Sequence, residues 1–126
     1  LAGHVHVQDW AIVGGMTGVH QFIKIGAHAM VGGGSALHKD VLPYVMISGN
    51  PSAVYGINSE GLKRRGFSPE QIMSIKRAYK MVFRQDLTIE QAIEAIEQAM
   101  QADAANASAM RLMADFLRTA ERGIVR

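Results

Sequence analysis

The chain has 126 residues, enough for one ordinary domain or for two small units that share a core. With 48% hydrophobic and 19% charged residues the composition is globular, and no apolar run approaches the ~20 residues that a membrane helix needs. A net charge of +2 is too small to indicate a nucleic-acid partner. Cysteine is absent, which excludes disulfides and thiolate metal sites and favours a cytoplasmic location.

The positive charge lies in the second half of the sequence. Residues 1–54 contain two Lys, two Asp and all five His, whereas residues 55–126 contain the other 11 Lys and Arg against nine acidic residues. The densest cluster is Lys63-Arg64-Arg65. A basic run of this kind is usually a solvated face, although it would also suit the docking of an acidic partner.

Residues 1–42 follow a period of six. Written in hexads they read LAGHVH, VQDWAI, VGGMTG, VHQFIK, IGAHAM, VGGGSA and LHKDVL. The first position is always aliphatic, in Leu1, Val7, Val13, Val19, Ile25, Val31 and Leu37. The fifth position is small or β-branched, in Val5, Ala11, Thr17, Ile23, Ala29, Ser35 and Val41. Neither a helix nor an alternating strand has this period, which is typical of a parallel β-helix.

In such a fold each hexad contributes one short strand and a turn, and three hexads form one coil. Positions one and five should point into the narrow interior, and we expect Gly or Asn-like residues to provide the corners with positive φ. The hexads then amount to two complete coils and the start of a third. Because about three repeats are needed for stability, we expect further coils before Leu1.

The period changes after Leu42. Pro43-Tyr44 and Asn50-Pro51-Ser52 are turn signals that should end the β-helix. Ser68 and Thr88 each begin a capping box, with Gln three residues later, and each is followed by an apolar stripe at helical spacing. Met110, Met113, Phe116 and Leu117 indicate a third helix that ends near Gly123. The expected division is therefore residues 1–54 as β-helix and residues 55–126 as about three helices.

Four segments are more specific than the hexads: Leu1–Val5, Gly14–Phe22, Gly49–Pro51 and Asn58–Phe67. With the helical tail they resemble the acyl-ACP:UDP-N-acetylglucosamine O-acyltransferases of lipid A synthesis in Gram-negative bacteria. The resemblance covers essentially the whole chain and the second half of that family's usual length. It implies a left-handed parallel β-helix followed by a C-terminal helical subdomain, a cytoplasmic location and a homotrimer.

The resemblance also implies a reaction. Members of this family transfer a 3-hydroxyacyl group from acyl carrier protein to the 3-hydroxyl of UDP-N-acetylglucosamine. The donor is carried on the phosphopantetheine of the carrier protein, so no separate cofactor is implied. A neutral His acts as general base and a backbone N–H stabilises the oxyanion. Gly3 matches the oxyanion donor, but the base is expected about one coil before Leu1, so these 126 residues alone should be inactive.

The remaining site assignments rest on the same matches. His4, His20, Gln21, Asn58, Glu60, Arg64 and Arg65 match substrate-binding positions, with the two arginines placed for phosphate oxygens of the nucleotide or of the pantetheine arm. Gly33 matches the position that limits acyl-chain length, and its missing side chain implies a preference for longer chains. Gly32-Gly33-Gly34 lacks the sequence context of a phosphate loop, and we interpret Gly32 as a turn residue.

Other readings stay open. His20 and Gln21 could simply lie on a solvated face. His4, His20 and His38 could in principle supply a zinc site shared between subunits, as in the β-helical carbonic anhydrases, but the flanking residues favour a transferase without metal. The chain could also be another hexapeptide-repeat acyl- or acetyltransferase, or a non-catalytic trimerisation scaffold.

Overall fold

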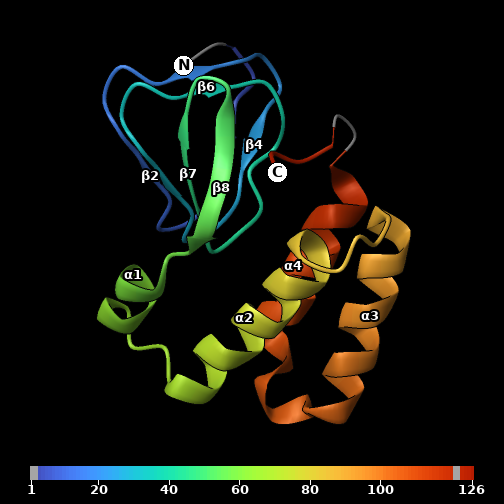
Figure 1. Ribbon diagram of the computed structural model, residues 1–126. Helices are drawn as coiled ribbons and strands as arrows, with labels where there is room; N and C mark the ends of the chain where they lie inside the picture. The colour runs from blue at the N-terminus through green and yellow to red at the C-terminus, as the bar shows by residue number, and fades with distance from the viewer. Residues whose placement is uncertain (1–2, 121–122) are drawn as a thin grey trace. The chain divides into compact units, whose positions relative to one another are not determined.

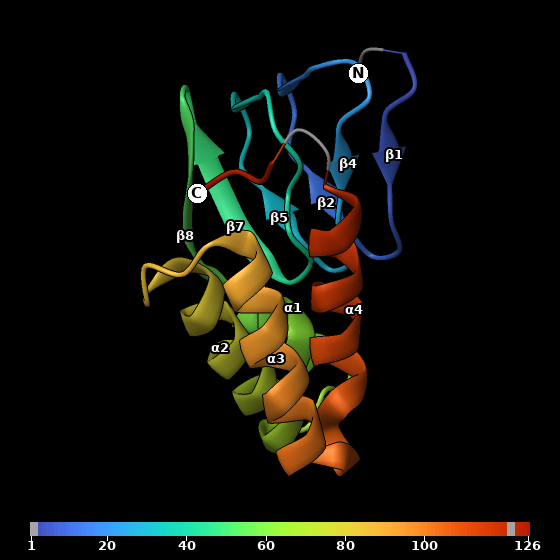
Figure 2. The same cartoon turned by 90° about the vertical axis from the view of Figure 1, so that its right-hand side faces the viewer.

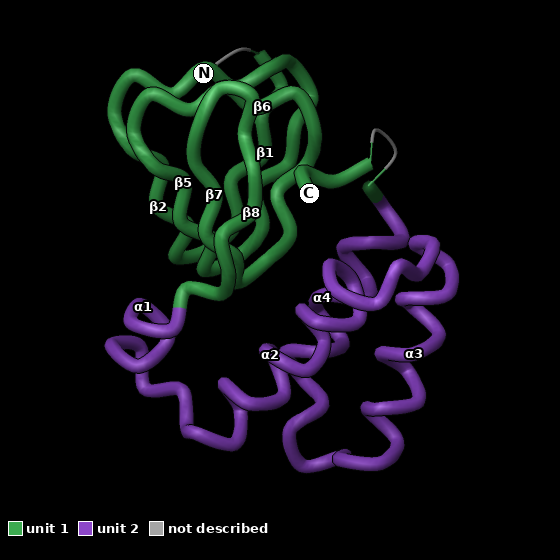
Figure 3. The backbone as a smooth tube through the Cα atoms, in the orientation of Figure 1, with its two compact units in different colours: residues 1–58, 120–126 green, residues 59–119 purple. Residues whose placement is uncertain are grey.

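A computed structural model describes residues 3–120 and 123–126. The chain divides into two compact units, Leu1–Asn58 with Ala120–Arg126, and Ser59–Thr119 (Figure 3). The expected division lay between residues 54 and 55. The observed one differs because the last strand continues to Ile57 and because residues near the C-terminus pair with the first unit. The expected inward position of Leu1 lies outside the described residues.

The first unit contains six two-residue strands, each at the junction of two hexads. They are β1 (His6–Val7), β2 (Ile12–Val13), β3 (Gly18–Val19), β4 (Lys24–Ile25), β5 (Met30–Val31) and β6 (Ala36–Leu37) (Figure 1). Pairing is parallel between β1 and β4, β2 and β5, and β3 and β6. His6 pairs with Lys24, so the chain returns to the same sheet after 18 residues. This spacing confirms the prediction of three hexads per turn.

The inward positions follow the predicted pattern from Val19 onward. Four first-position residues are buried, Val19, Ile25, Val31 and Leu37, as are four fifth-position residues, Ile23, Ala29, Ser35 and Val41. Val7 is 40% exposed on the edge strand β1. The buried interior positions therefore run from Val19 to Val41, through the second turn of hexads and into the seventh hexad.

The prediction that Gly or Asn-like residues provide the corners is wrong for all but one of them. Positive φ occurs at the fourth position of the first six hexads, and the residues there are His4, Trp10, Met16, Phe22, His28 and Gly34. Glycines at the second position serve close approach instead. A Cβ on Gly26 would lie 2.4 Å from the backbone nitrogen of Pro43, and one on Gly32 would lie 2.9 Å from Cβ of Ser48. Gly32 is thus a packing residue rather than a turn residue.

The hexad pattern gives way to a hairpin. β7 (Val45–Gly49) joins β5 in parallel and pairs antiparallel with β8 (Ser52–Ile57), which completes a four-stranded sheet in the order β2-β5-β7-β8 (Figure 2). Nearby, Asp40 connects the seventh hexad to the C-terminal segment. Its backbone N–H donates to the carbonyl of Gly123 at 3.1 Å, and its carbonyl accepts from Val125 at 2.8 Å.

The second unit is helical. It contains α1 (Ser59–Arg64), α2 (Pro69–Phe83), α3 (Ile89–Ala102), the 3₁₀ helix η1 (Ala104–Asn106) and α4 (Ala107–Thr119). Both capping boxes are confirmed: Ser68 and Thr88 each accept the N–H of the Gln three residues later and donate their own N–H to that side chain. α4 ends at Thr119 rather than near Gly123. α1 was not predicted.

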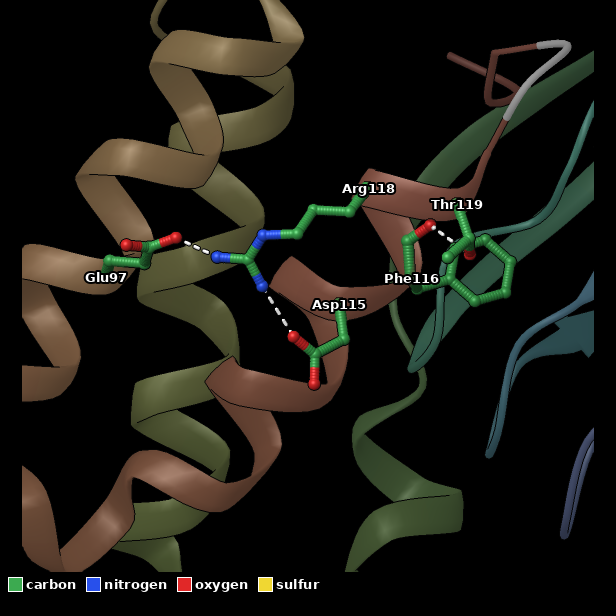
Figure 4. Close-up of polar contacts among 5 residues, drawn as sticks. All are labelled: Glu97, Asp115, Phe116, Arg118 and Thr119. Carbon is green, nitrogen blue, oxygen red and sulfur yellow. Dashed lines mark hydrogen bonds and ion pairs between the residues drawn. The ribbon is translucent and has the colours of Figure 1, made fainter.

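The helices pack through apolar stripes, with a polar tie between α3 and α4. Residues with little or no exposure include Ile75 and Val82 on α2, Ile96 on α3, and Met110 and Met113 on α4. The guanidinium of Arg118 bonds to Glu97 of α3 and to Asp115 of α4, while the Thr119 hydroxyl donates to the carbonyl of Phe116 (Figure 4). These ion pairs are partly exposed, so packing contributes more to stability than they do.

Candidate functional site

The outward positions beside β3 and β6 bring two histidines together. Val19 and Leu37 are paired in the parallel register, and the N–H of His20 donates to the carbonyl of Leu37 at 3.0 Å. His20 and His38 follow these buried residues, so both side chains point away from the interior and both are exposed. Their ring centroids lie 5.8 Å apart at an interplanar angle of 49°. Gln21, which follows His20, is also exposed.

Gly3 and His4 lie at a corner of the first hexad. His4 has a φ of 59°, and its ring stacks on Phe22 with centroids 4.9 Å apart and an angle of 11°. The Phe22 N–H donates to the carbonyl of Gly3 at 3.4 Å. No described heavy atom would lie within 4 Å of a Cβ on Gly3. Among the described residues, the side of Gly3 on which a Cβ would lie is therefore open.

An apolar hollow lies on the four-stranded sheet, next to the triple glycine. It has a volume of about 280 Å³, and its lining consists of Met30, Gly32, Met46, Ile47, Ser48 and Tyr55. Met30, Met46 and Tyr55 are 40%, 37% and 65% exposed. Gly33 follows Gly32 and is exposed, although a Cβ there would lie 3.1 Å from the carbonyl oxygen of Gly15. A hollow of this kind suits a hydrocarbon chain better than a polar ligand.

Asn58, one of the predicted binding residues, has a structural role in the strand unit. It is 6% exposed, its backbone N–H donates to the carbonyl of Tyr44 at 2.7 Å, and its side-chain amide donates to the carbonyl of His28 at 3.1 Å. Tyr44 in turn stacks on His28, with ring centroids 5.7 Å apart. Burial raises the pKa of the Tyr44 phenol to about 12. Asn58 thus holds the end of β8 against the corner at His28.

The helix α1 presents the predicted acidic and basic residues. It ends in a Schellman motif: the N–H of Phe67 donates to the carbonyl of Leu62, the N–H of Gly66 donates to that of Lys63, and Gly66 has a φ of 85°. Glu60, Arg64 and Arg65 are exposed. Lys63 Nζ lies 3.7 Å from Glu60 Oε1. Gly66 is the sequence signal for the C-terminal end of this helix. The helix has only six residues, too few to show an apolar stripe at helical spacing.

The predicted residues therefore fall into several groups. His20 and Gln21 follow β3 and His38 follows the neighbouring strand β6, with the rings of His20 and His38 in contact. His4 contacts Phe22, and Asn58 bonds to the backbone of His28. Within residues 3–120 and 123–126, no three His, Cys, Asp or Glu side chains converge in a way that could hold a metal ion. Over the same residues no helix is long and apolar enough to cross a membrane.

The sequence of the chain matches known proteins along its whole length. It is 47% identical over 126 residues to the acyl-[acyl-carrier-protein]--UDP-N-acetylglucosamine O-acyltransferase of Burkholderia mallei (strain SAVP1), and 51% identical to that of Thiobacillus denitrificans (strain ATCC 25259 / T1). These matches cover 100% of this chain but 48% and 47% of the two relatives. The chain thus spans about half the length of the curated relatives it matches.

The fold matches solved structures equally well. The UDP-N-acetylglucosamine O-acyltransferase of Moraxella catarrhalis RH4 superposes with a TM-score of 0.91 at 39% identity, over 99% of this chain and 47% of that one. The corresponding protein of Acinetobacter baumannii superposes with a TM-score of 0.90 at 46% identity, over 98% of this chain and 46% of that one. A family model described as UDP N-acetylglucosamine O-acyltransferase, domain 2, matches residues 40–125. The chain belongs to the UDP-N-acetylglucosamine O-acyltransferase family.

Proposed function

We propose that this chain is part of an enzyme that transfers a 3-hydroxyacyl group from acyl carrier protein to the 3-hydroxyl of UDP-N-acetylglucosamine, the first step of lipid A synthesis. The observation that carries the proposal is a match over all 126 residues of this chain to acyltransferases whose names specify both the acyl carrier protein and the nucleotide sugar. The position of His20 and Gln21 supports it, because both are exposed on the strand unit rather than buried in its core.

The reaction is an acyl transfer without a covalent enzyme intermediate. A neutral His takes the proton of the sugar 3-hydroxyl as its oxygen attacks the thioester carbonyl, and the resulting oxyanion accepts a hydrogen bond from the N–H of Gly3. Collapse of the tetrahedral intermediate breaks the carbon–sulfur bond, and the phosphopantetheine sulfur leaves as a thiol after it receives the proton. None of the residues matched here is the base, so we propose that a His elsewhere in the protein provides it.

The other matched residues bind the substrates. His4, His20 and Gln21 are proposed to hydrogen-bond the nucleotide sugar. Asn58 orders the end of β8 through its bond to His28 and, with Glu60, is proposed to contact the sugar nucleotide. Arg64 and Arg65 are proposed to bind phosphate oxygens, for which an exposed guanidinium is well suited. The excess of basic residues after residue 55 supports docking of the acidic carrier protein.

We further propose that the first unit is a left-handed parallel β-helix, that the protein is a cytoplasmic homotrimer, and that the acyl chain runs past Gly33. The apolar hollow beside Gly32 supports the last point. With no side chain at Gly33 the path stays open, so longer 3-hydroxyacyl donors should be preferred. A competition between short and long donors tests this: a Gly33→Met variant with the same preference as the parent would contradict it.

An activity assay tests the reaction itself. The part of the Burkholderia mallei relative that precedes the matched region is joined to Leu1 of this chain, and the chimera is incubated with 3-hydroxyacyl carrier protein and labelled UDP-N-acetylglucosamine. We expect the O-acylated nucleotide sugar from the chimera and none from the 126 residues alone. The intact relative serves as the positive control.

Two results would count against the proposal. A chimera that folds and yet produces no acylated nucleotide sugar, while the intact relative does, would show that this sequence has lost the acyltransferase site. Turnover by the 126 residues alone would show that the base lies within them.

A further inference from the structure

We propose that His38 is a second ligand-binding histidine, which contacts the diphosphate of the nucleotide sugar beside His20. This inference rests on the function proposed above, in which His20 contacts UDP-N-acetylglucosamine. His38 lies outside the segments that relate the chain to its family, so those segments assign it no role. The structure indicates one because it brings the two imidazoles into contact.

The contact follows from the register of β3 and β6. Gly18 pairs with Ala36 and Val19 with Leu37, so the residues that follow each strand occupy equivalent positions one strand apart. Neighbouring strands are separated by ~4.8 Å, and the ring centroids of His20 and His38 lie 5.8 Å apart. A ligand that reaches His20 from outside the unit therefore also meets His38.

The pair differs from the other histidine contacts of this unit. His4 stacks on Phe22 at an angle of 11°, and His28 stacks on the buried ring of Tyr44 at 15°. Each of these imidazoles lies flat against an aromatic ring, as expected for packing. The rings of His20 and His38 are tilted by 49° and both residues are exposed, so this contact covers little apolar surface.

The local charge favours an anion. Gln21 follows His20, and Lys39 follows His38. The nearest acidic residue along this segment, Asp40, is 3% exposed, and its Oδ1 accepts the backbone N–H of Lys24 at 2.8 Å. Each imidazole ring has a nitrogen that can donate a hydrogen bond to a phosphate oxygen. A diphosphate provides several such oxygens on adjacent phosphorus atoms.

Imidazole NMR tests the inference on the chimera described above, labelled with ¹⁵N-histidine and kept in a chelator to exclude metal. The His20→Gln and His38→Gln variants assign the two rings, and UDP-N-acetylglucosamine, UDP and uridine are titrated in turn. We expect the first two ligands to shift both rings with one common Kd, and phosphate-free uridine to leave His38 unchanged. His38→Gln should raise the Kd for UDP-N-acetylglucosamine about three- to tenfold.

His6→Gln is the matched control, because His6 is an exposed histidine on β1 with no proposed contact to the ligand. It should change the Kd by less than about twofold, within the usual range of surface substitutions. If His20 responds while His38 neither shifts nor affects the Kd, the role of His38 is refuted and the proposed function stands. If neither ring responds, the contact of His20 with the nucleotide is refuted and the inference falls with it.

Discussion

The two units of this chain depend on contacts that differ in sequence separation, distant in the strand unit and local at the helix starts. In the strand unit each two-residue strand pairs with a segment 18 residues away, and a glycine such as Gly26 is required by Pro43 on the next layer. In the helical unit, α2 and α3 each begin with a capping box that spans only four residues. A single change in the strand unit should therefore disturb its neighbours in space, whereas a change at a helix start should remain local and small.

The largest expected effect is that of Gly26→Ala. The added Cβ would lie 2.4 Å from the backbone nitrogen of Pro43, a distance that requires the backbone to move. We expect a loss of at least about 3 kcal/mol in the free energy of unfolding. The single tryptophan, Trp10, lies in the strand unit, so urea unfolding followed by its fluorescence measures the effect where it arises.

Gly15→Ala is the control for this change. Gly15 belongs to the same unit and is exposed, and no described heavy atom would lie within 4 Å of its added Cβ. Its free energy of unfolding should change by no more than about 0.5 kcal/mol. Equal losses of unfolding free energy in the two variants would show that the close approach of Pro43 is not the reason why Gly26 must be glycine.

A smaller effect, confined to high pH, is expected from Tyr44. Burial raises its pKa from 10.0 to about 12 in the folded state, so between these values the unfolded chain loses the phenolic proton and the folded chain keeps it. Stability should therefore fall as pH rises through this window, by roughly 2–3 kcal/mol in total. Below pH 10 the phenol is protonated in both states, and this contribution does not vary with pH.

Tyr44→Phe separates this contribution from general alkaline unfolding. The variant should show a shallower loss of stability between pH 10 and 12, measured as the difference from the parent in parallel urea titrations. Tyr55→Phe, which changes an exposed tyrosine of the same unit, provides the comparison. An unchanged slope in Tyr44→Phe would rule out the buried phenol as its source.

The smallest effect is expected at the start of α3. Thr88→Ala removes the hydroxyl that accepts the Gln91 N–H at 3.1 Å, while Thr88→Ser keeps it. The alanine variant should lose about 1 kcal/mol and the serine variant much less. Thermal unfolding followed by far-ultraviolet circular dichroism compares the two. A loss of the size expected for Gly26→Ala would contradict the view that helix starts act locally.

The parts of the fold that could be predicted are those with a sequence pattern that either repeats along the chain or lies within a few neighbouring residues. Seven aliphatic residues at a spacing of six indicated the strands, and the Ser68 and Thr88 caps indicated the starts of two helices. The corners were predicted wrongly because left-handed backbone is imposed there on residues such as His4, Trp10 and Phe22, which do not favour it on their own. The pairing of Asp40 with Ile124 spans most of the chain and leaves no local pattern.

The candidate site shows the same limit. The outward position of His20 and Gln21 followed from the hexad register, but the contact between His20 and His38 depends on which strands lie side by side. Asn58 could be matched to a family position, whereas its bond to the carbonyl of His28, 30 residues away, could not be anticipated. Sequence spacing therefore predicted which side chains face outward and did not predict which of them meet.

The central claim is that the interior residues of the strand unit determine its fold, whereas outward residues such as His20 bind the nucleotide sugar. The most direct test is kcat/KM for acyl transfer by the chimera with His20→Ala, measured together with its unfolding temperature. We predict a loss of about tenfold to a hundredfold in kcat/KM, the effect of removing a hydrogen bond to a charged ligand, with the unfolding temperature within about 2 °C of the parent. Unchanged kcat/KM, or a loss that accompanies unfolding, would contradict the claim.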